Sequence, residues 1–223
     1  MESPWLYIGA VFEVIVLGVF AVRVGRRKIP PTSSASWVMW LAMDSLILAA
    51  TLAAEKPPWL ALSYVIGAAV VTVVLFFVGK WTWTFRDTFC AVCMTIATII
   101  WQTTSAEYGV FAEVAAMVIS GIPILLDMLR APVRKTFPVW SGTVCACVLT
   151  LFGSDGTLAG SVLPWGSLLY NGTLALLVLR GPKEDAVPDA GILPVNETVE
   201  DGHEQFGYIK EFGAGYPRGG RFD

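Results

Sequence analysis

Seven apolar runs follow one another through the first 180 residues of the chain. They lie at about 4–23, 36–54, 59–79, 87–104, 108–129, 138–153 and 160–179, and the sixth is the shortest. A helix needs roughly 20 apolar residues to cross the hydrocarbon core of a bilayer. The runs are continuously apolar, whereas the strands of a membrane barrel would alternate. The sequence therefore predicts an all-α membrane protein with seven transmembrane helices.

Composition and charge agree with a multi-pass integral membrane protein. The chain is 55% hydrophobic and only 15% charged, which is too apolar for a soluble domain of 223 residues. With alternating helices, ten Lys and Arg residues fall in the connections at one side, and only Lys56 falls at the other. Basic residues favour the cytoplasmic side. We therefore expect the N-terminus outside, the C-terminus in the cytoplasm, and a retained first helix.

Residues 181–223 have a different composition from the rest of the chain. They carry nine acidic and four basic side chains among many glycines and prolines. Such a segment buries too little apolar surface to offset the entropy of ordering it. We expect a disordered cytoplasmic tail. A partner-binding peptide around residues 206–212 of this tail is an alternative interpretation.

Nothing in the chain predicts enzyme chemistry. The spans contain no histidine and no H-E-x-x-H or G-x-S-x-G motif. Cys90 and Cys93 form a C-x-x-C pair, but a zinc site would lack further ligands, because the single histidine is His203 in the tail. We expect these cysteines, with Cys145 and Cys147, to be buried and inert. We expect no enzyme activity, metal, cofactor or nucleic-acid partner.

The sequence contains an internal repeat. The motif P-W-x-x-L-x-Y occurs at 58–64 and again at 164–170. An offset of 103 residues aligns Gly18 with Gly121, Arg27 with Arg130, Ser33 with Thr136, and Trp37 with Trp140. Each repeat therefore holds three spans, and the fourth span is left as a linker, so that both repeats enter the membrane in the same orientation.

This layout resembles the SWEET and PQ-loop carrier families. The segment "GIPILLDMLRAPVRKTFPVW", 121–140, is similar to their signature: a proline within a helix, a basic loop, the pair Lys135-Thr136, then a helix that opens with proline and an aromatic residue. Asn171 stands where SWEET carriers place a substrate-contacting asparagine, although Val65 occupies the paired position. The resemblance implies two parallel three-helix bundles, 1–80 and 107–180, a linker helix within 81–106, and the tail 181–223.

Carboxyl groups within the spans are candidates for function. Glu13 and Asp44 lie midway along the first and second spans, with no basic residue at a matching depth. A charge there costs roughly 2.5–3.5 kcal/mol, and burial favours the protonated form. Either could couple transport to protons, or form a structural hydrogen bond to a neighbouring helix. Glu113 is expected to reach the outer interface, and Asp127 to pair with Arg130.

Two tryptophans are further candidates for the solute site. Trp40 lies one helical turn from Asp44 on the same face of the second span, and Trp140 lies near the inner end of the sixth. Most other tryptophans fall near span ends, where they fit the interfacial aromatic belt. The predicted substrate-binding set is therefore Asn171, Trp40, Asp44, Trp140 and Glu13. The repeated P-W-x-x-L-x-Y motif is interpreted as scaffold.

These features predict a SWEET/PQ-loop-like carrier that moves a small polar, sugar-like solute by alternating access. A second interpretation is a nicotinamide riboside or nucleoside transporter of the same 3+1+3 layout. A third is a non-transporting membrane scaffold or receptor that acts through a cytoplasmic partner of its tail. A homo-oligomer is also compatible with the sequence.

Overall fold

The structure is a computed structural model that describes residues 2–29, 33–130 and 132–181. The chain divides into two units, Met1–Ala186 and Val187–Asp223. The second unit, and with it the predicted tail beyond residue 181, lies outside the described residues.

The first unit is all-helical in its described part, as predicted. Its helices are α1 (Pro4–Gly25), α2 (Ser34–Ala53), α3 (Trp59–Val78), α4 (Phe85–Thr103), α5 (Ala106–Arg130), the 3₁₀ turn η1 (Arg134–Thr136), α6 (Phe137–Gly153) and α7 (Leu158–Val178). Each α-helix begins and ends within two residues of a predicted span. The agreement follows from hydrogen bonding, because only a helix satisfies the backbone groups of a single segment in hydrocarbon.

Six helical segments of the described residues are long and apolar enough to cross a membrane, with η1 and α6 counted together as Arg134–Gly153, and α4 is the exception. The reason is its polar ends: Arg86 and Asp87 lie in its first turn, and Gln102 lies in its last. Asp87 accepts hydrogen bonds from the backbone and side chain of Thr84, both at 2.7 Å, which caps the start of α4. Large apolar side chains such as Ile96 still lie exposed along α4. The described helices therefore fit a multi-pass membrane protein.

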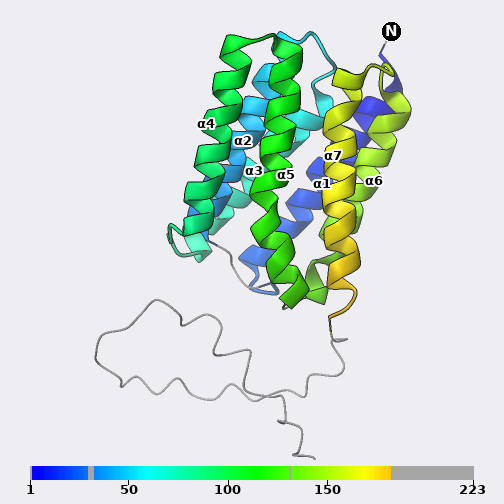
Figure 1. Cartoon of the computed structure of the whole chain (residues 1–223). Coiled ribbons are helices and arrows are strands. Elements are labelled where there is room, and N and C mark those ends of the chain that lie inside the picture. Colours follow the sequence, from blue (N-terminus) through cyan, green and yellow to red (C-terminus); the bar gives the residue numbers. More distant parts are fainter. Residues whose placement is uncertain (1, 30–32, 131, 182–223) are drawn as a thin grey trace, which may run out of the picture. The chain divides into compact units, whose positions relative to one another are not determined.

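We call α1, α2 and α3 the first triad of helices, and α5, α6 and α7 the second. In the first triad α3 packs against both α1 and α2, and in the second α7 packs against both α5 and α6. The triads meet where α1 packs against α6 and where α2 packs against α5, while α4 contacts α5 and α2. Figure 1 shows that the helices alternate in direction, so that α1, α3, α5 and α7 all start at the same end of the bundle.

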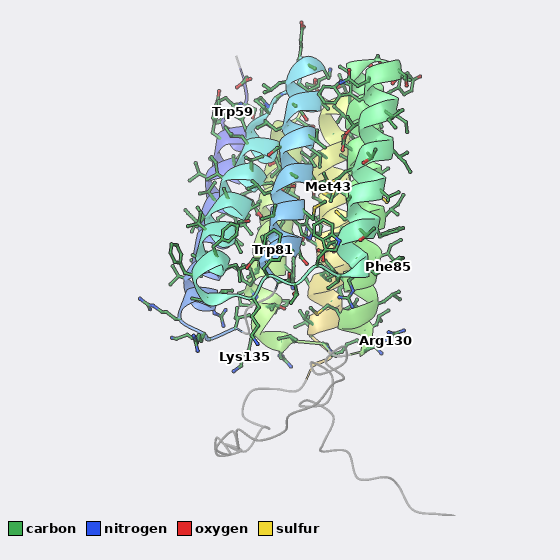
Figure 2. All side chains as sticks on the ribbon, turned by 90° about the vertical axis from the view of Figure 1, so that its left-hand side faces the viewer. Met43, Trp59, Trp81, Phe85, Arg130 and Lys135 are labelled. Carbon is green, nitrogen blue, oxygen red and sulfur yellow. The ribbon has the colours of Figure 1, made fainter. Side chains whose placement is uncertain are left out.

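The two ends of the bundle differ in charge. The basic residues Arg130 and Lys135 lie at the end opposite to Trp59 (Figure 2). We call the end that holds Trp59 the loop end and the other the basic end. Met43 points into the bundle and is fully buried, whereas Phe85 points outward and is 83% exposed. Exposed apolar surface of this kind is what a helix presents to lipid.

Candidate functional site

Two of the predicted residues, Glu13 and Asp44, come together in the interior of the bundle. Each lies nine residues from the loop end of its helix, which corresponds to a depth of about 13 Å at 1.5 Å per residue. Glu13 is 1% exposed and Asp44 is 7% exposed. Their carboxyl groups are close enough to interact electrostatically. The structure therefore brings two acidic groups from different helices of the first triad into one buried region.

The second triad supplies the other wall of this region. Thr143 on α6 donates a hydrogen bond of 3.0 Å from Oγ1 to Glu13 Oε1. Tyr64 on α3 lies with its hydroxyl 3.4 Å from Cys147 Sγ on α6, and it lies close to Ser167 on α7. These side chains are buried. We call the set Glu13, Asp44, Tyr64, Thr143, Cys147 and Ser167 the central cluster.

Two atoms of the central cluster lack a hydrogen-bond partner among the described residues. They are Glu13 Oε2 and Ser167 Oγ. A buried polar atom left without a partner costs about 1–3 kcal/mol. The salt bridge found in the described part of the chain lies elsewhere, between Lys56 and Asp155. The cluster therefore offers unsatisfied hydrogen-bonding capacity, and two acidic groups that form no ion pair with a described basic residue.

Two of the other predicted residues, Trp40 and Asn171, lie near a second contact between the triads, whereas Trp140 bonds at the start of its own helix. The rings of Trp40 on α2 and Tyr170 on α7 have centroids 6.2 Å apart. Asn171, the next residue after Tyr170, is buried and donates from Nδ2 to the carbonyl of Ser167 at 2.8 Å. That bond uses one amide hydrogen and leaves Oδ1 as an acceptor. Trp140 donates from Nε1 to Thr136 Oγ1 at 3.0 Å, at the start of its own helix.

The sequence did not predict most of the residues that α6 and α7 contribute to the central cluster. The four cysteines were expected to be buried and inert. Cys90 and Cys147 are buried, but Cys145 is exposed and Cys93 is partly exposed, so that expectation is wrong for these two. Cys147 contacts Tyr64 within the cluster. The signal was present in the repeat, because the offset that aligns Trp37 with Trp140 also aligns Asp44 with Cys147. Tyr64 belongs to the repeated motif that was interpreted as scaffold, whereas the structure makes its hydroxyl part of the cluster.

One expectation about the other carboxyl groups is wrong. Glu113 does not reach an interface: its side chain is 0% exposed, because α4 covers it and Thr98 on α4 hydrogen-bonds to it. The side chain of Asp127 lies outside the described part of the structure, so its pairing with Arg130 stays a prediction.

A salt bridge joins two loops at the loop end of the bundle. Lys56 Nζ, in the α2–α3 loop, lies 3.3 Å from Asp155 Oδ2, in the α6–α7 loop. Beneath it is a cavity of about 20 Å³, lined by both triads through residues that include Thr51, Leu60, Thr150 and Leu163. That volume holds about one water molecule. Lys56 and Thr150 both line the cavity, and Thr150 lies one turn from Cys147 of the cluster.

Hydrogen bonds hold Asp155 in position for this contact. Its Oδ1 accepts from the backbone N–H of Thr157 at 2.9 Å and from the Thr157 hydroxyl at 2.7 Å. These bonds, and to a lesser extent Lys56, lower the pKa of the Asp155 carboxyl from its ordinary value. The loop carboxyl is therefore kept ionised, which favours the contact with the lysine.

Comparisons with family models, with curated proteins and with solved structures each found no match for this chain. The structure supports a multi-pass, all-helical membrane protein with a buried polar cluster between two helical triads.

Proposed function

We propose that this chain is a membrane carrier that moves a small polar solute by alternating access, with its site at the central cluster. The observation that carries the proposal is the composition of that cluster. Both triads contribute to it, and it holds two carboxyl groups and two unpartnered polar atoms in the apolar interior. Buried ionisable groups within a membrane usually mark a substrate or ion pathway, because they are costly to retain otherwise.

The order of helix neighbours supports a duplicated carrier fold. If α1, α2 and α3 correspond to α5, α6 and α7, the contact of α1 with α6 corresponds to that of α5 with α2. The matching directions of the two triads in Figure 1 agree with parallel repeats joined by α4. Carriers built from such repeats bind substrate near the middle of the membrane, between the repeats. The position of Glu13 and Asp44 nine residues into their helices, with the bond from Thr143 to Glu13 joining α6 to α1, supports a site of this kind.

The salt bridge at the loop end supports a closed state at that side. Lys56 and Asp155 belong to loops of different triads, so a rocking motion that parts the triads there would break their contact. The partly exposed pair contributes at most about 1 kcal/mol, so opening is not prevented by it. The concentration of basic side chains at the opposite end favours a cytoplasmic location for that end, with the N-terminus outside.

Uptake into proteoliposomes tests the proposal. We expect solute uptake by the wild type and its loss in Asp44→Asn and in Asn171→Ala, because the first removes a cluster carboxyl and the second the amide beside Tyr170. The matched controls are Ser45→Ala and Thr173→Val, whose exposed hydroxyls bond only to their own helices. Uptake that is the same in all four variants would remove these residues from the mechanism.

The solute class is tested by ligand stabilisation of the purified chain with a panel of sugars and nucleosides. A sugar-like solute is the leading candidate, because an amide, hydroxyls and an aromatic face suit a sugar ring. Stabilisation by nucleosides alone would replace the sugar by a nucleoside. Removing residues 182–223 addresses the scaffold alternative: a carrier keeps its uptake without the tail, whereas a scaffold loses its partner.

A further inference from the structure

Glu113 on α5 is a buried carboxyl group that the proposed site does not use. Its Oε1 accepts a hydrogen bond of 3.3 Å from the hydroxyl of Thr98 on α4. Its Oε2 is buried and has no hydrogen-bond partner among the described residues. The group is therefore sealed at the contact between α4 and α5, two helices that pack closely along their length (Figure 1).

The surroundings of Glu113 repeat those of Glu13. Each is a glutamate on the first helix of its triad, and each accepts from a threonine hydroxyl of a helix outside that triad: Thr98 for Glu113 and Thr143 for Glu13. In each, Oε2 is the buried oxygen without a partner. With the offset of 103 residues, Glu13 aligns with position 116, one helical turn from Glu113. Each triad therefore carries one such group.

The helices packed against α5 offer no cation that would neutralise an ionised Glu113. The charged residues of α4, Arg86 and Asp87, lie at its opposite end, more than about 15 Å along the helix from Thr98. The charged residue of α2 is Asp44, which is itself acidic and interacts with Glu13.

The remaining titratable groups near Glu113 do not supply a neutralising cation either. The titratable group of α7 is Tyr170, whose hydroxyl bonds to the carbonyl of Gly121, about two turns from Glu113. On α4 the thiol of Cys90 lies toward the far end of the helix and that of Cys93 lies at its middle, and Glu107 on α5 adds only negative charge. An unpaired carboxylate in such an interior costs several kcal/mol, so the group is retained in its neutral form.

We propose that Glu113 is a second proton-binding site of this chain, which holds its proton while α4 is packed against α5 and releases it to water when that contact opens. Because α4 also contacts α2, it bridges the triads, and a motion of one triad against the other changes its contacts. Each triad would then hold at least one buried carboxyl group that binds a proton. The link to transport rests on the proposed function, whereas proton binding at Glu113 does not.

Infrared spectroscopy of the full chain in liposomes at neutral pH tests proton binding directly. A protonated carboxyl group gives a carbonyl-stretch band that shifts when H₂O is exchanged for D₂O. We expect Glu113→Gln to lose one such band, and Glu13→Gln to lose a different one. A Glu113→Gln spectrum that keeps every band of the wild type would show that Glu113 is ionised, and would overturn the proposal.

A pair of threonine variants keeps the test valid if Glu113→Gln does not fold. Thr98→Val removes the donor to Oε1, so we expect the Glu113 band to move to higher frequency. Thr95→Val is the matched control, because the Thr95 hydroxyl is exposed and bonds to the carbonyl of Ala91 in its own helix. An unchanged spectrum in Thr98→Val, or an equal shift in Thr95→Val, contradicts the proposal. Absent uptake by the wild type would refute the carrier function and leave this result standing.

Discussion

Gly9 lies where α1 approaches α6, and replacing it with alanine tests the contact between the triads. A Cβ at Gly9 would lie 2.6 Å from Thr150 Oγ1 and 2.9 Å from the carbonyl oxygen of Ala146. The carbonyl is backbone and cannot rotate away, and the Thr150 hydroxyl is held by its own bond of 2.9 Å to that carbonyl. The new methyl group therefore forces the helices apart. Such overpacking typically costs about 1–3 kcal/mol.

Gly18 provides a matched control on the same helix. A Cβ at Gly18 meets no heavy atom within 4 Å. Alanine is a better helix former than glycine by up to about 1 kcal/mol, and this gain applies at both positions. The difference in unfolding free energy between Gly9→Ala and Gly18→Ala therefore isolates the overpacking cost, and corresponds to roughly a 5- to 150-fold change in the unfolding equilibrium.

The assay is reversible unfolding of the purified protein in mixed detergent micelles, titrated with a denaturing detergent and followed by circular dichroism. We expect Gly9→Ala to unfold at a lower denaturant fraction than the wild type, and Gly18→Ala at an equal or higher one. Equal stability of the two variants would mean that α1 and α6 do not approach at Gly9. It would remove the geometric basis for the central cluster, since the bond from Thr143 to Glu13 spans the same pair of helices.

Two further predictions concern the loop end and the central cluster. The Thr157 hydrogen bonds and Lys56 lower the pKa of the Asp155 carboxyl group. The ionised carboxyl group therefore stabilises the fold fully above the ordinary pKa of an aspartate, and this stabilisation is lost as the pH falls through the lowered pKa of the folded state. An unfolding series across that acidic range should show a loss of at most about 1 kcal/mol, which is absent in Asp155→Asn; an equal loss in that variant would refute the assignment. Tyr64→Phe removes the hydroxyl beside the central cluster and should cost about 0.5–1.5 kcal/mol in the same unfolding assay, whereas Tyr108→Phe, at a position 64% exposed, should cost nothing measurable. Equal effects of the two changes would place the Tyr64 hydroxyl outside any buried hydrogen bond.

Part of the candidate site was predictable from single residues. A carboxyl group in the middle of an apolar run, as at Glu13 and Asp44, stands out against any apolar background, and both prove to be buried in one region. Thr143 and Cys147 do not stand out in this way, because threonine and cysteine are common in membrane helices and carry no charge. Their role depends on a partner from another helix, and Thr143 lies 130 residues from Glu13.

Glu113 shows why depth along a helix does not predict burial. Its position near the loop end of α5 is equally compatible with an exposed and a covered side chain. In water, an amphipathic pattern would reveal which face of a helix is covered. In a membrane the lipid is as apolar as the protein interior, so the pattern of apolar residues does not distinguish the two faces.

The amino-acid sequence alone determined that the described part of the chain forms seven α-helices, and it predicted their bounds to within two residues. It could do so because backbone hydrogen bonding in hydrocarbon leaves the helix as the solution for each apolar run. Only the tertiary structure decided which faces meet: that Thr143 reaches Glu13, that Lys56 reaches Asp155, and that α4 seals Glu113. These contacts join residues far apart in the chain, and they depend on close packing of side chains that apolarity does not encode.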